Sequence, residues 1–237
     1  MNPTFKSTFL IGLCTMLIAG IMMFYDKSTK PENVINPDYQ KAPMIAFEFA
    51  KTPSEINLLF LKKDNINLNR LFINKMKTLN VIDFAFILSY VLFLMSFSFV
   101  MRKQNIEILG YVGVFVSLIV GISDVMENVQ LLNILKKIKS SEKYLPELKN
   151  LYFWTWIKWG FLGISMGVLL PCLLKVKNSI FTIGLGILMA CVAIVGLVAF
   201  ISQCPIWISR YIGLIFIPLF PFLIVYSLAR WKMWLKN

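Results

Sequence analysis

Long runs of apolar residues alternate with short polar segments along most of the chain. The runs cover about residues 8–25, 84–101, 106–123, 151–174, 180–201 and 207–230. Each has about 18 or more residues, which as a helix crosses a hydrocarbon core roughly 30 Å thick. Helices are expected because they satisfy their own backbone hydrogen bonds in lipid, and the alternation typical of a membrane barrel is absent. The pattern therefore predicts an all-α polytopic membrane helix bundle of about six transmembrane helices.

The polar segment between the first two runs, residues 26–80, carries its own helix signal. Within "KTPSEINLLFLKK", Thr52 is placed to cap a helix, Pro53 suits the first helical position, and Glu55 completes a capping box. One face of the segment then collects Ile56, Leu59, Phe60 and Lys63. This arrangement predicts an amphipathic helix at the outer membrane surface.

We expect a single integral membrane domain over residues 1–237. It comprises an extracytoplasmic segment over 26–80, core helices over 81–175 and two additional transmembrane helices over 180–230. Pro218 and Pro221 should kink the last of these helices. The first run also resembles a signal peptide, but no good cleavage site follows it, which favours a retained helix.

Composition agrees with a membrane protein and narrows its partners. The 237 residues are 58% hydrophobic and 15% charged, with a net charge of +12. Lysine and arginine gather in loops and at helix ends, where they meet lipid headgroups, so membrane lipids rather than nucleic acid are the expected partners. The chain has no histidine, and no two of its four cysteines form a CxxC pair. We therefore expect no cofactor and no metal site.

The distribution of basic residues predicts the orientation. With six spans, the N-terminus, "RKQNIE", "KVK" and the "RWKMWLKN" tail share one side, and these basic segments contain only Glu107 as an acid. Short basic loops face the cytoplasm. We therefore expect both termini in the cytoplasm and the chain in the bacterial inner membrane.

The most informative stretch is "GISDVMENVQLL", which places Asp124, Glu127 and Asn128 within one helical turn after an apolar run. Asp124 comes roughly 27 Å along a helix that enters near residue 106. Asp83 at the start of the second span and Lys158 near the start of the fourth fall at a similar depth. These five polar side chains should therefore converge near the outer leaflet.

A ridge of small residues predicts which way this group faces. Gly113, Ser117 and Gly121 follow one another at intervals of four, and the same stripe continues through Asp124 to Asn128. Small residues at this spacing mark close helix–helix contacts in membranes. The polar side chains should therefore point into the bundle.

Charge balance at this depth is incomplete. Asp83, Asp124 and Glu127 face Lys158, with Arg210 as a second candidate base. Because a lone charge in the membrane is costly, a carboxyl stays protonated, or a cation or ligand completes the set, or water reaches it. We expect Glu127 to be the most exposed to water of the three acids.

The segments "FEFAKTPSE", "IDFAFILSY", "GISDVMENVQLL" and "WTWIKWGF" together resemble a family of small, uncharacterised bacterial multi-pass membrane proteins with a D-x-x-E-N motif. The resemblance covers about residues 45–165, and it implies no agreed activity. It adds Glu48 and Tyr90 as matching positions. The candidate ligand-binding residues are then Glu48, Asp83, Tyr90, Asp124, Glu127, Asn128, Lys158 and Arg210.

Three functions fit this arrangement. The leading hypothesis is a binding or transport role, in which the cluster holds a small polar or cationic ligand, a proton or a lipid headgroup. The second is a lipid-active membrane enzyme that uses Asp124 or Glu127 as general acid or base and Lys158 to stabilise negative charge. The third is a structural or assembly subunit in which the cluster only locks helices together.

Overall fold

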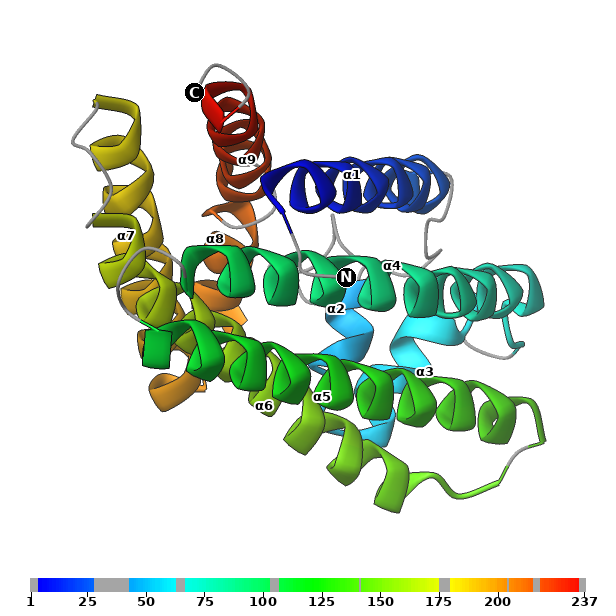
Figure 1. Cartoon of the computed structure of the whole chain (residues 1–237). Coiled ribbons are helices and arrows are strands. Elements are labelled where there is room, and N and C mark those ends of the chain that lie inside the picture. Colours follow the sequence, from blue (N-terminus) through cyan, green and yellow to red (C-terminus); the bar gives the residue numbers. More distant parts are fainter. Residues whose placement is uncertain are drawn as a thin grey trace. The chain divides into compact units, whose positions relative to one another are not determined.

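A computed structural model describes residues 4–27, 43–62, 67–102, 107–140, 142–174, 180–203, 205–214 and 218–234. Almost all of these residues are helical. Figure 1 labels the helices, which are α1 (Phe5–Lys27), α2 (Pro43–Glu48), α3 (Pro53–Phe60), α4 (Arg70–Arg102), α5 (Glu107–Ser140), α6 (Leu145–Leu174), α7 (Ile180–Ser202), α8 (Pro205–Leu214) and α9 (Phe220–Trp234). Within these ranges the only extended pairing is an isolated bridge between Leu61 and Leu68. The predicted all-α class is confirmed.

Five of the described helices are long and apolar enough to cross a membrane, namely α1, α4, α5, α6 and α7. The expected sixth span is divided between α8, with 10 residues, and α9, with 15. Pro218 lies just before α9 and Pro221 within its first turn. Because proline cannot donate a backbone hydrogen bond, a helix tends to break at such positions. The count of six spans is therefore not confirmed.

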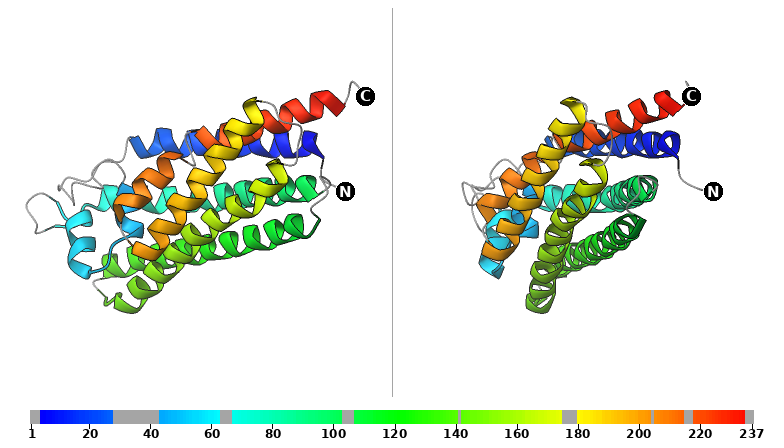
Figure 2. Two further views of the ribbon diagram at one scale, coloured as in Figure 1. Left: turned by 90° about the vertical axis from the view of Figure 1, so that its left-hand side faces the viewer. Right: turned by 60° about the vertical axis from the view of Figure 1, so that its left-hand side comes forward.

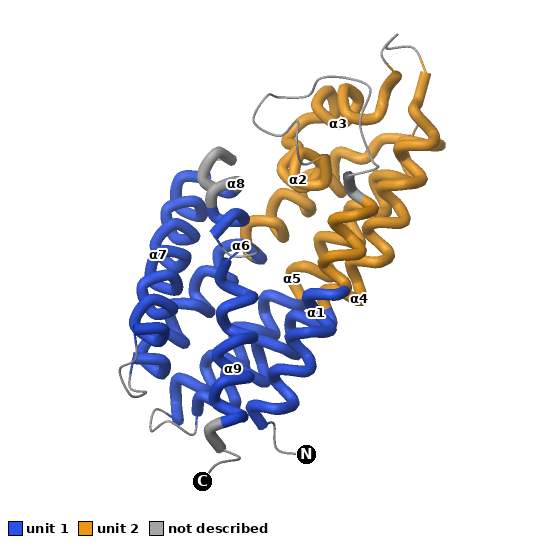
Figure 3. Tube along the Cα trace, turned by 90° about the horizontal axis from the view of Figure 1, so that it is seen from above, with its two compact units in different colours: residues 1–17, 88–121, 158–237 blue, residues 18–87, 122–157 orange. Residues whose placement is uncertain are grey.

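Contacts along the chain define two compact units, which Figure 3 shows in separate colours. Unit 1 contains residues 1–17, 88–121 and 158–237. Unit 2 contains residues 18–87 and 122–157. The boundaries fall inside α1, α4, α5 and α6, so each of these helices contributes one portion to each unit.

Helices α4 and α5 lie side by side and antiparallel, as Figures 1 and 2 show. In unit 1, a Cβ atom added to Gly113 would lie 2.7 Å from Ser98 Oγ, and one added to Gly121 would lie 2.9 Å from Val91 Cγ2. From Gly113 to Gly121 along α5, the contacted residue on α4 changes from Ser98 back to Val91, as expected for antiparallel helices. The predicted ridge of small residues on α5 is therefore a close helix contact, and its partner is α4.

The core of unit 2 collects the shorter helices around the portions of α4, α5 and α6. Thr52 caps α3 by accepting a hydrogen bond from the backbone N–H of Glu55, as the capping box predicts. The buried core residues include Phe47, Ile56, Leu59, Phe60, Phe72, Ile73, Met76, Leu131, Ile134, Leu135, Leu148 and Leu151. This core fixes α2 and α3 on the helices that carry the polar residues.

The apolar face of α3 is covered by protein. Ile56, Leu59 and Phe60 are at most 1% exposed, and all three belong to the unit 2 core. The expected amphipathic pattern is present, but core packing already buries the face that was expected to meet lipid. The role as a membrane-surface helix is therefore not confirmed, and Lys63 lies outside the described residues.

In unit 1, α1 packs closely on α4 and α9. Thr8 and Ser96 are hydrogen-bonded through their hydroxyl oxygens at 2.6 Å. A Cβ atom on Gly12 would approach the side chains of Ile224 and Phe93 at 2.6 and 2.9 Å. These contacts, made through small residues, pack one face of α1 closely against its neighbours.

Candidate ligand-binding site

A hydrogen bond between a buried asparagine and a partly exposed aspartate joins α4 and α5 in unit 2. Asn128 Nδ2 donates to Asp83 Oδ2 across 2.8 Å, and it lies 3.5 Å from the backbone oxygen of Asn80. Asn128 is 1% exposed, whereas Asp83 is partly exposed. The antiparallel register that pairs Gly121 with α4 continues here, so the stripe predicted from the sequence does bring Asn128 to Asp83.

Asp124 and Glu127 lie on the same stretch of α5 and are buried with Asn128. Asp124 is 6% exposed and Glu127 is 0% exposed. The expectation that Glu127 would be the most exposed to water of the three acids is wrong. Glu127 lies on the stripe that continues through Leu131 and Ile134, and these residues are fully buried in the unit 2 core.

Asn80 is a polar residue of this region that the sequence reading missed. It is 0% exposed, and its Nδ2 donates to the backbone oxygen of Met76 across 2.8 Å. Its Oδ1 has no hydrogen-bond partner among the described atoms. The sequence did contain a signal, because Asn80 lies three residues before Asp83 and therefore on the same face of α4.

We define the polar cluster as Asn80, Asp83, Asp124, Glu127 and Asn128. All five residues belong to unit 2 and lie on the portions of α4 and α5 that pack together there. Between Lys77 and Lys136 of this helix pair, the two portions in unit 2 carry three carboxyl groups and no basic residue. The cluster is therefore rich in hydrogen-bond acceptors.

Glu48 is held in the same unit by contacts of α2 with α6. It is 7% exposed, and its backbone oxygen accepts a hydrogen bond from Thr155 Oγ1 at 3.3 Å. The next residue, Phe49, packs edge-on against Trp156 with ring centroids 5.2 Å apart. Met44 Sδ, also on α2, lies 3.9 Å from Asn80 Nδ2. These contacts position α2 beside both the α4 portion and the α6 portion of unit 2.

Lys158, Tyr90 and Arg210 belong to unit 1. Lys158 is 7% exposed, with its Nζ 4.9 Å from the centroid of the Trp159 ring, and Tyr90 is 5% exposed. The side chain of Arg210 lies outside the described residues. The pairing of Lys158 with the carboxyl groups of the polar cluster stays a prediction.

The chemistry of the cluster favours a ligand that carries positive charge or donates hydrogen bonds. Carboxylate and amide oxygens attract cations, but among the described residues no group of three or more acidic, histidine or cysteine side chains is placed to hold a metal ion. The same oxygens accept hydrogen bonds from ammonium groups or from water. A buried amide oxygen without a partner costs about 1–3 kcal/mol, so the position of Asn80 Oδ1 favours occupation by such a donor.

Comparisons with known proteins found no match to this chain. No protein-family model matches the chain. No curated protein and no solved structure matches it either. The resemblance to small bacterial multi-pass membrane proteins therefore stays a prediction.

Proposed function

We propose that this chain is a multi-pass protein of the bacterial inner membrane that binds a small cation or polar hydrogen-bond donor at the polar cluster. The observation that carries this proposal is Asn80 Oδ1, a fully buried acceptor without a hydrogen-bond partner among the described atoms, one turn from the Asp83–Asn128 hydrogen bond. A bound donor or cation would satisfy this oxygen.

The proposed membrane arrangement has six crossings. The five long apolar helices supply five of them, and α8 and α9 together supply the sixth. Both termini lie in the cytoplasm, because most of the short basic segments group on that side, although the basic "KKIKSSEKYLPELK" lies on the other. The α2–α3 segment then covers the outer ends of α4 and α5. Reporter fusions after Lys41 and at Asn237 test this topology, and a C-terminal reporter active only outside would contradict it.

Binding is favoured over a purely structural lock by the chemistry of the cluster. A lock between two helices needs matched donors and acceptors, as Asn128 and Asp83 provide. Asn80 Oδ1 adds a buried acceptor that has no hydrogen-bond partner among the described atoms, so this position is not a matched contact. Carboxyl groups at membrane depth are expensive and mark ion or substrate sites more often than simple contacts.

Thermal unfolding of the purified full chain in detergent tests the proposal. The probes are Na⁺, K⁺, Mg²⁺, Ca²⁺ and spermidine, each as the chloride at matched ionic strength. A probe at 100 times its Kd stabilises the folded protein by about 2.7 kcal/mol. We expect at least one probe to raise the Tm of the wild type and to lose that effect in Asp83→Asn.

The matched control is Glu142→Gln, which removes an acid from an exposed position outside the polar cluster. This variant should keep the full response to the stabilising probe. Equal loss in Glu142→Gln and Asp83→Asn would mean that the probe acts on surface charge. The absence of any response in the wild type would contradict the cation-binding form of the proposal.

A further inference from the structure

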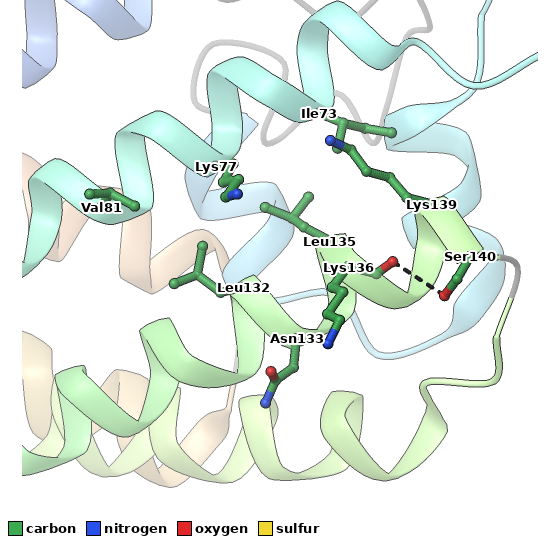
Figure 4. A pocket seen from close by; sticks show the side chains of 9 residues that line it. All are labelled: Ile73, Lys77, Val81, Leu132, Asn133, Leu135, Lys136, Lys139 and Ser140. Carbon is green, nitrogen blue, oxygen red and sulfur yellow. Dashed lines mark hydrogen bonds between the residues drawn. The ribbon is translucent and has the colours of Figure 1, made fainter.

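A groove lined by lysines lies between α4 and α5 in unit 2, and Figure 4 shows it from close by. Its volume is about 460 Å³. The lining residues are Ile73, Lys77 and Val81 on α4, and Leu132, Asn133, Leu135, Lys136, Lys139 and Ser140 on α5. None of these nine residues is acidic. The groove therefore combines a basic rim with an apolar wall.

The antiparallel register places the lysines at one level. Asn74 on α4 faces the end of α5, since its Oδ1 accepts a hydrogen bond from Lys139 Nζ at 2.6 Å. Lys77 is about one turn further along α4, and Lys136 about one turn further back along α5. Lys77 and Lys136 therefore lie at matching heights, and both are exposed. Both lysines line the groove, so its rim attracts an anion.

The groove also lies where a long stretch without basic residues ends on each helix. Residues 78–101 of α4 and 108–135 of α5 contain no basic residue, so Lys77 and Lys136 are the first basic residues at this end of the helix pair. Lysine at such a boundary reaches toward the headgroup layer while its stem covers apolar surface. On the apolar side of the groove, Val81 is 54% exposed, as expected of a side chain that faces lipid. Figure 4 shows Leu132 and Leu135 directed from α5 toward α4 beside it.

We infer that this groove binds the headgroup of an anionic phospholipid. The phosphate diester would lie between Lys77 and Lys136, and Lys139, held by Asn74, would add a third positive charge. The glycerol and the first part of an acyl chain would lie along Val81, Leu132 and Leu135. This site is separate from the polar cluster, because Lys77 lies about 9 Å along α4 from Asp83 and its charge is of opposite sign.

A lipid fits the groove better than a free anion does. Inorganic phosphate would meet the lysines, but it would leave the apolar wall exposed to water. A phospholipid covers both, because it joins an anionic headgroup to hydrocarbon. Lysines at the end of a long stretch without basic residues are also typical of the layer where headgroups are concentrated.

Native mass spectrometry of the full-length protein in detergent tests the inference. The probes are dioleoylphosphatidylglycerol, dioleoylphosphatidylcholine and inorganic phosphate. We expect phosphatidylglycerol to bind at least tenfold more tightly than phosphatidylcholine, and phosphate to compete only weakly. Equal binding of the two lipids, or displacement of phosphatidylglycerol by phosphate at similar concentration, would overturn the inference.

The decisive variant is the double substitution Lys77→Gln with Lys136→Gln. Each lysine near an anionic headgroup contributes about 1 kcal/mol to binding, so the loss of both should weaken binding of phosphatidylglycerol by roughly 30-fold. The matched control, Lys143→Gln with Lys149→Gln, removes the same charge from exposed positions outside the groove. The control should change binding by less than threefold. An equal loss in both double variants would show a general charge effect and overturn the inference.

Discussion

Asn128 donates a hydrogen bond of 2.8 Å to the Asp83 carboxylate and thereby joins α5 to α4 within the apolar part of both helices. Asn128 is almost fully buried, so water does not readily replace the bond at its amide when Asp83 is changed. Membrane-embedded hydrogen bonds between side chains contribute on average about 0.6 kcal/mol and at most about 1.7. The pair is therefore a modest but measurable source of stability and orientation.

A double-mutant cycle measures this pair. We expect Asn128→Leu to destabilise the protein, because it leaves a carboxylate beside an apolar group. Asp83→Asn combined with Asn128→Leu should recover about 1 kcal/mol relative to the sum of the single changes. Equilibrium unfolding in mixed micelles supplies the free energies. Additive free energies would show that the two side chains are not coupled.

The close contact of α4 with α5 predicts a large effect at Gly113. A Cβ atom there would lie 2.7 Å from Ser98 Oγ and 3.0 Å from Ser98 Cβ. We expect Gly113→Val to lower the free energy of unfolding by about 1–3 kcal/mol, because the helices must move apart. Gly184→Val on α7 is the control, since a Cβ atom at Gly184 meets nothing within 4 Å. Equal losses in the two variants would contradict the close contact.

Tyr144 predicts how unit 2 responds to alkaline pH. Its hydroxyl donates to Asn57 Oδ1 at 3.1 Å, and burial raises the pKa of this phenol above its ordinary value. Below about pH 10 the phenol is neutral in both the folded and the unfolded protein, and its contribution to the free energy of unfolding is complete. At higher pH the unfolded chain loses the proton first, so stability falls as pH rises through the folded pKa.

The measurement for Tyr144 is a stability profile from pH 7 to pH 11 in detergent. We expect Tyr144→Phe to cost about 1 kcal/mol at neutral pH through loss of the hydrogen bond. The variant should also show a shallower decline above pH 10 than the wild type. A decline of the same steepness would mean that other groups control the alkaline response.

Lys158 provides a prediction about the balance of buried charge. Removal of one partner of a buried ion pair costs about 3–5 kcal/mol, because the other charge stays buried. If Lys158 neutralises the carboxyl groups, Lys158→Met should destabilise more than Lys158→Met combined with Asp124→Asn. Thermal unfolding in detergent compares the two variants. Greater destabilisation of the double variant would show that Lys158 does not neutralise the carboxyl groups.

Patterns of apolar and small residues predicted most of the helical framework. The α5 boundaries follow from its apolar run and its lysine-rich end, and the stripe from Gly113 to Asn128 gave both its partner face and the meeting with Asp83. These features depend on helical periodicity, which is regular over long helices. The capping of α3 by Thr52 was predictable for the same local reason.

Features that depend on which segments cover one another were harder to predict. The sequence shows that α3 has an apolar face, but it does not show whether lipid or protein covers that face. Glu127 was misjudged for the same reason, because its burial depends on the core of unit 2 rather than on its own helix. Asn80 was missed because asparagine is mostly exposed in proteins, and its burial here depends on the segments that pack over α4.

The central claim is that the polar cluster is a ligand site, and infrared difference spectroscopy of its carboxyl groups tests this claim most directly. Spectra of the full chain are recorded with and without the probe that stabilises it, and Asp83→Asn, Asp124→Asn and Glu127→Gln assign the bands. The account predicts a change in carboxyl bands upon binding that at least one of these variants removes and that Glu142→Gln retains. Carboxyl bands that stay unchanged with every probe, in a protein that remains folded, would contradict the account and leave a lock between helices.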